Sequence, residues 1–166
     1  KVGFKEIILV AQDTTRYGED IYVGYRYFET FAKDRVRFPF GFGMSYTSFD
    51  LTASDFKLDG DKVTGSVNVK NTGSTPGREV VQIYCSAPQG KLGKPARVLC
   101  GFDKTRTLQP GESQTITMNV DMSLLASYDS QNAKTFIVDP GDYYFAIGSD
   151  AHDALNNILA AQGKTN

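Results

Sequence analysis

Apolar and polar residues alternate with a period of two along several stretches in the middle of the chain. The clearest is KVTGSVNVKN at 62–71, in which three valines share one face. EVVQIYCS at 79–86 and SQTITMNVD at 113–121 follow the same pattern. Alternation of this kind is typical of half-buried strands, so each stretch predicts a strand.

Turn-forming residues separate these strands: NTGSTPG, QPGE and DPGD each join Gly and Pro to short polar side chains. Further strands are expected around 49–56, 97–102, 134–138 and 143–148. About seven short strands with no helical pattern between them predict a mainly β fold, an antiparallel sandwich of two sheets over residues 46–148. Its core is expected to include Val67, Val69, Val81, Ile83, Leu99, Ile116, Met118, Val120 and Ile147.

The spacing of apolar residues changes to that of a helix only after Gly148. Ser149-Asp150 can cap the helix, and Asp153 suits its first turn. The apolar stripe consists of Ala151, Ala154, Leu155, Ile158 and Leu159, and Gly163 ends it. This stripe predicts a short C-terminal helix that packs on another part of the protein.

Aromatic residues are concentrated before the predicted sandwich. Residues 18–49 hold ten of the chain's twenty Phe and Tyr residues. Exposed rings of this kind would form a sugar-binding surface, whereas covered rings would form a seam between domains; packing is the favoured interpretation. Gly24, Gly41, Gly43 and Pro39 favour an extended connector over a helix or strand.

Charge and cysteine content exclude several classes of protein. The net charge is −1, and no run of like charges exceeds a pair, which argues against a nucleic-acid or polybasic membrane surface. The longest apolar run, Ile7 to Ala11, is far shorter than the roughly 20 residues of a membrane span. Cys85 and Cys100 are expected to be reduced and buried. His152 has no companion at ligand spacing and is expected to be a solvated surface residue, so neither a metal site nor a cofactor is predicted.

Five blocks, in order along nearly the whole chain, resemble glycoside hydrolase family 3 enzymes, chiefly β-glucosidases. They are IYVGYRYFET, FPFGFGMSYTSF, VNVKNTGSTPGREVVQIYCSAP, GFDKTRTLQPGESQTITMNV and PGDYYFAIGSD. The resemblance implies an immunoglobulin/fibronectin type III-like antiparallel β-sandwich with an extended N-terminal connector and a short C-terminal helix. Residues 1–45 would be the tail of an α/β sandwich domain, 46–148 the fibronectin type III-like domain, and 149–166 a helix and linker toward a following domain.

The resemblance also implies a retaining hydrolase that cleaves terminal β-linked glucose with a pair of carboxylates about 5–5.5 Å apart. The family's Asp nucleophile lies on a TIM barrel and its Glu acid/base on the α/β domain, and neither motif is visible here. Glu19, Asp20 and Glu29 are the nearest substitutes, but a structural role is expected for them, such as the pairing of Glu19 or Asp20 with Arg26. No catalytic, substrate-binding or metal-binding residue is therefore assigned, and the chain alone is predicted to be inactive.

Other expectations concern the parent protein. KVGFKE has no start Met or signal features, which indicates an interior piece of a longer chain. The expected partners are the α/β and barrel domains, with sugar bound only through them, and a homo-oligomer remains open. The tail resembles the subgroup in which the barrel follows the sandwich.

The absence of an Asn-x-Ser/Thr site gives no sign of a secreted eukaryotic context, so a bacterial cytoplasm is favoured and the compartment is otherwise unassigned. The long loop 87–95 is expected to be exposed, with contact to a neighbouring domain or subunit as the alternative. A free-standing carbohydrate-binding or adhesion module is the alternative function.

Overall fold

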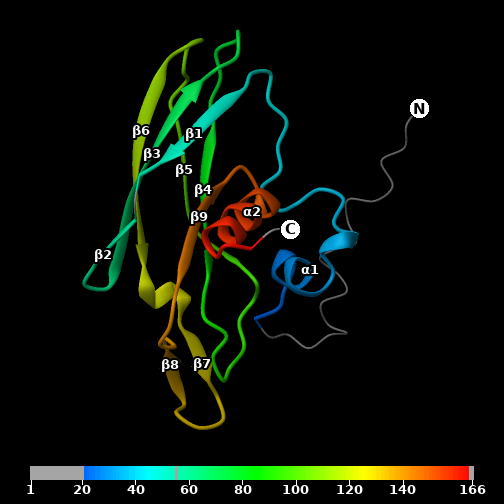
Figure 1. Ribbon diagram of the computed structural model, residues 1–166, viewed down its shortest axis with the longest axis vertical. Coiled ribbons are helices and arrows are strands. Elements are labelled where there is room, and N and C mark those ends of the chain that lie inside the picture. Colours follow the sequence, from blue (N-terminus) through cyan, green and yellow to red (C-terminus); the bar gives the residue numbers. More distant parts are fainter. Residues whose placement is uncertain (1–20, 55, 165–166) are drawn as a thin grey trace.

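Two antiparallel sheets form the body of the protein in a computed structural model that describes residues 21–54 and 56–164 (Figure 1). The first sheet contains β1 (Phe49–Ala53), β2 (Lys57–Asp59), β3 (Lys62–Asn71) and β6 (Ser113–Asp121). The second has the order β5 (Val98–Lys104), β4 (Val80–Ser86), β9 (Tyr144–Gly148). The predicted mainly β, two-sheet sandwich is confirmed.

A separate hairpin, β7 (Ser127–Asp129) with β8 (Thr135–Ile137), projects from the lower end of the sandwich in Figure 1. It follows the short 3-10 helix η3 (Met122–Leu125). The strand predicted around Phe49 to Phe56 ends at Ala53, and the next strand pairs separately with β3. The strands added to the predicted set are short ones of three residues.

The core lies between the two sheets, as the alternating pattern predicted. Its buried members are Val63, Val67, Val69, Val81, Ile83, Leu108, Ile116, Met118, Val120 and Ile147. The prediction that Leu99 belongs to this core is wrong. The pairing of β4 with β5 shifts register between Ile83 and Tyr84, so that Leu99 lies opposite Tyr84 and packs on the outer face of the second sheet.

Strand β4 is buried along most of its length because both faces of the second sheet are covered. One face packs on the first sheet, and the other carries α1 (Tyr25–Phe31) and α2 (Ala151–Ala161) (Figure 1). The prediction of an extended connector is wrong for α1, and a 3-10 turn, η2 (Lys33–Arg35), follows it. Gly24 precedes α1 with φ +59°, a conformation that favours glycine.

The predicted C-terminal helix is confirmed. The Asp150 side chain caps α2 by accepting hydrogen bonds from the backbone N–H groups of His152 (2.8 Å) and Asp153 (2.9 Å). Ala151, Ala154 and Ile158 are buried. A Cβ on Gly148 would lie 2.6 Å from the backbone nitrogen of Ala154, so glycine is required for the helix to lie this close to β9.

Candidate functional site

The predicted site residues divide into two groups. Glu19 and Asp20 lie outside the described residues, as does any pairing with them. Glu29 lies on α1, where it is the one buried residue of that helix, with 1% of its side chain exposed. The structure brings Glu29 together with two basic side chains that are distant in sequence, those of Arg97 and His152.

The three side chains form a buried charged cluster between α1, α2 and the start of β5. Arg97 Nη2 lies 3.0 Å from Glu29 Oε2, and His152 Nε2 lies 2.9 Å from Glu29 Oε1. Arg97 also donates to two backbone carbonyls, that of Ala151 at 3.0 Å and that of Glu29 at 3.2 Å. The expectation that His152 is a solvated surface residue is wrong, because its side chain is 26% exposed and faces Glu29.

Burial lowers the pKa of Arg97, and the neighbouring Glu29 carboxylate acts in the opposite direction. An arginine titrates so far above neutral pH that the guanidinium stays charged. Glu29 Oε2 faces the Arg97 guanidinium, and Oε1 faces the His152 ring. These contacts link helices α1 and α2 to the sandwich, which supports a structural role for Glu29.

A second polar network attaches the segment after α1 to the sandwich. The Tyr84 hydroxyl donates a hydrogen bond shared between Gln82 Oε1 (2.7 Å) and the Phe40 carbonyl (3.1 Å). Gln82 Nε2 donates to the Ser149 carbonyl at 2.6 Å. Burial raises the pKa of Tyr84, so this phenol remains a hydrogen-bond donor at neutral pH. The segment after α1 is therefore bonded to the sandwich through the Phe40 carbonyl.

Several large apolar side chains in the segment from Phe31 to Tyr46 are exposed. We define the connector face as six side chains that are 44–99% exposed: Phe31, Phe38, Phe40, Phe42, Met44 and Tyr46. The rings of Phe38 and Phe42 pack on each other with centroids 5.2 Å apart. Large apolar side chains that are exposed together in one segment are candidates for contact with another part of a protein.

The loop at 87–95 is less exposed than predicted. Lys94 is 4% exposed, and its Nζ lies 3.3 Å from Asp139 Oδ2 and donates to Ser127 Oγ at 2.6 Å. Gln89 bonds the backbone of Lys94 in both directions. These contacts fix the loop against the sandwich.

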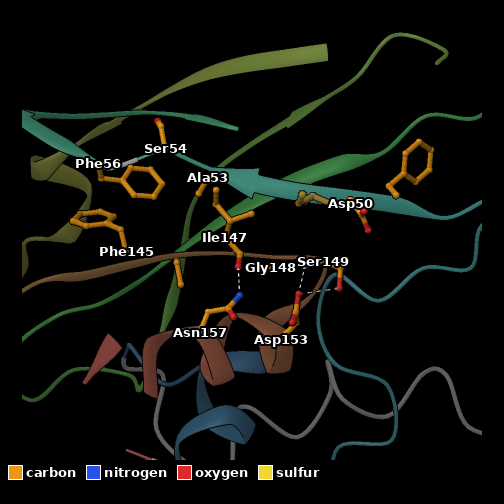
Figure 2. Close-up of a pocket in the computed structure, with 13 residues that line it drawn as sticks. Asp50, Ala53, Ser54, Phe56, Phe145, Ile147, Gly148, Ser149, Asp153 and Asn157 are labelled. Atoms are coloured by element: carbon orange, nitrogen blue, oxygen red, sulfur yellow. Dashed lines mark hydrogen bonds between the residues drawn. The ribbon is translucent and has the colours of Figure 1, made fainter. Parts of the chain in front are cut away.

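A groove lies between strands β1 and β9, with the first turns of α2 along one side (Figure 2). It encloses about 610 Å³. Phe56 and Phe145 lie at one end with ring centroids 6.0 Å apart. Asp153 and Asn157 of α2 point into the groove, and Asn157 Nδ2 donates to the Ile147 carbonyl at 2.7 Å.

Neither cysteine offers a reactive thiolate. Both are free thiols, and Cys85 is buried while Cys100 is half-buried, so burial of Cys100 is less complete than expected. Burial raises the pKa of both thiols, to about 12 for Cys100. Within residues 21–54 and 56–164, no cluster of His, Cys, Asp or Glu is placed to hold a metal ion. In the same part of the chain, neither helix combines the length and apolar character that a bilayer crossing requires.

The amino-acid sequence and the fold of this chain are similar to parts of longer, multidomain enzymes. Residues 79–151 match the model of the fibronectin type III-like domain. A β-glucosidase from Ruminococcus albus is 54% identical over 147 residues, which are 86% of this chain and 15% of that relative. The β-glucosidase from Paenibacillus barengoltzii matches with a TM-score of 0.79 and 49% identity, over 82% of this chain and 16% of that chain.

β-Glucosidase 3B from Thermotoga neapolitana, solved in complex with α-D-glucose, matches with a TM-score of 0.76 and 39% identity, over 82% of this chain and 19% of that chain. This chain therefore spans less than a fifth of the length of these three relatives.

Proposed function

We propose that this chain is a non-catalytic structural portion of a glycoside hydrolase family 3 β-glucosidase. The premise is that the chain is homologous to one part of these enzymes and contains their fibronectin type III-like domain. The whole enzyme would be a retaining hydrolase that releases terminal β-linked glucose. In this proposal, residues 1–45 are the tail of an α/β sandwich domain, 46–148 the accessory sandwich, and 149–166 a helix and linker toward a following domain.

The connector face is the observation that carries the proposal. Met44 is 94% exposed and Tyr46 is 99% exposed, although both lie close in sequence to Phe40, whose carbonyl accepts a hydrogen bond from Tyr84 of the sandwich. Aromatic side chains bury on the order of 150–250 Å² each when covered. We infer that the α/β or barrel domain of the enzyme covers this face, and that the sandwich thereby fixes the orientation of those domains.

The contacts of Glu29 support a non-catalytic role. Retaining hydrolysis needs one carboxylate that attacks and a second that donates a proton, about 5–5.5 Å apart. Glu29 has its oxygens against Arg97 and His152, and its side chain is 1% exposed, so it has no access to a sugar. The alternative, a free-standing carbohydrate-binding module, would need exposed rings beside hydrogen-bonding groups; the connector rings make it worth testing.

The proposal predicts that the isolated chain releases only background p-nitrophenol from the p-nitrophenyl β-glucoside and β-xyloside. The physical reason is that the Glu29 side chain is 1% exposed and its two oxygens face Arg97 and His152, so it cannot reach a sugar. A longer enzyme that carries the chain should hydrolyse the glucoside with retention. Glu29→Gln, Glu19→Gln and Asp20→Asn are the variants to compare in the isolated chain.

Turnover by the isolated chain that disappears in any of these three variants would contradict the proposal. Titration calorimetry with cellobiose, laminarin and xylan tests the alternative function, that of a free-standing carbohydrate-binding module. Millimolar or tighter binding that Tyr46→Ala abolishes would favour the carbohydrate-binding module.

A further inference from the structure

Among the residues that the structure describes, β1 pairs with β3 alone, so its other backbone edge, beside the groove of Figure 2, is unpaired. The N–H of Thr72 donates to the Ser48 carbonyl, and that of Ser54 donates to the Ser66 carbonyl. In an antiparallel pair, bonded residues alternate with unbonded ones. The register between β1 and β3 then directs the N–H and C=O groups of Phe49, Leu51 and Ala53 away from β3, toward the groove.

Strand β9 presents a second edge on the other side of the groove. It pairs with β4, and within the part of the chain that the structure describes no other strand pairs with it. The Ile147 carbonyl points away from β4, because Asn157 of α2 donates to it at 2.7 Å. Asn157 thus occupies one hydrogen-bond acceptor on the β9 edge, so the β1 edge is the more accessible to a further strand.

The floor of the groove belongs to the sandwich core. Phe49, Leu51, Phe56 and Phe145 are only partly buried although they pack on core residues. Edge strands are normally covered, shortened or charged, so apolar side chains beside the β1 edge favour the addition of a further strand there. The five residues of β1 span about 17 Å at about 3.4 Å per residue, which sets the length of segment that fits.

We propose that this groove is a strand-acceptor site, and that an extended segment of the same longer enzyme pairs with the β1 edge at Phe49, Leu51 and Ala53. The proposal rests on the proposed function, because the relatives are long enough to supply the segment: this chain covers 15% of the Ruminococcus albus β-glucosidase. The segment would carry small or apolar residues at alternate positions, facing Phe56 and Phe145, and no proline within the paired residues.

Proline substitution distinguishes the two faces of β1. Ala53→Pro removes an N–H group that points to the groove, so the ladder with β3 should survive, as proline is tolerated on the free side of an edge strand. The melting temperature of the isolated chain should change by no more than a few degrees. In the longer enzyme the same substitution should remove a bond to the added strand and lower the melting temperature by several degrees more. Thr52→Pro removes an N–H group directed at β3 and should destabilise both proteins.

Amide hydrogen exchange, followed by mass spectrometry with residue-level fragmentation, gives the second readout. In the isolated chain the amides of Leu51 and Ala53 should exchange at least tenfold faster than those of Asp50 and Thr52. In the longer enzyme all four should be slow. Fast exchange of Leu51 and Ala53 in the longer enzyme would overturn the proposal, as would an equal effect of Ala53→Pro on the two proteins.

The same hydrogen-exchange measurement tests two other possible occupants of the groove. Protection in the isolated chain that rises with protein concentration would assign the edge to a second copy, and protection by added laminarin oligosaccharide would assign it to a glycan; either result overturns the proposal. Failure of the proposed function would be recognised separately, by turnover in the isolated chain.

Discussion

Arg97→Met is expected to lower the free energy of unfolding by about 3–5 kcal/mol, because it leaves the Glu29 carboxylate buried without its main cation. The Arg97 side chain is 1% exposed and also holds the Ala151 and Glu29 carbonyls. Urea denaturation followed by circular dichroism measures the loss. Hydrogen exchange should show that α1 and α2 lose protection first, since both helices are tied to the sandwich through this residue.

The exposed pair Arg106–Glu112 offers a matched control. Arg106 is 54% exposed and lies 2.7 Å from Glu112. Arg106→Met makes the same chemical change at the surface, where solvent screens the pair, and should leave the urea midpoint nearly unchanged. The double variant Arg97→Met/Glu29→Leu should recover much of the loss, since it removes both charges. Equal midpoints for Arg97→Met and the unaltered chain would refute a stabilising role for the cluster.

Ile83→Ala is expected to cost about 2–5 kcal/mol through lost burial and the cavity that remains. Ile83 is 0% exposed and lies between the two sheets. Leu58→Ala removes a comparable side chain that is 65% exposed, and should change stability by no more than about 0.5 kcal/mol. Thermal unfolding of the two variants in parallel tests the core assignment, which would be wrong if they lost the same stability.

The sandwich could be predicted from the sequence because alternation reports directly on burial in a strand with one exposed face. The valines of β3 illustrate this: Val67 and Val69 are both 0% exposed. Leu99 could not be placed in the same way, because the register shift opposite Ile83 reverses the face it occupies, and no local pattern marks that irregularity. Alternation does not place Leu108 in the core, because this residue pairs with Gly77 in an isolated bridge and belongs to no strand.

The contacts that link α1 and α2 to the sandwich join residues distant in the chain, so local sequence patterns could not predict them. Helix α1 has the sequence YRYFETF, rich in aromatic residues that have only moderate helix propensity, and Arg97 and His152 stabilise it from other elements. His152 itself looked isolated because its partner is distant in the chain. The concentration of rings in residues 18–49, in contrast, was visible in the sequence, and the exposed connector face shows where those rings lie.

Oxidation of Met44 by hydrogen peroxide, followed by peptide mapping, tests most directly whether another domain covers the connector face. Met44 is 94% exposed in this chain, whereas Met118 is 6% exposed in the core and serves as the internal reference. Sulfoxide formation follows exposure of the sulfur. Met44 should be oxidised much faster than Met118 in the isolated chain, and at least tenfold more slowly in a longer family 3 enzyme that carries the chain. Equally fast oxidation of Met44 in both proteins would contradict the proposed interdomain role.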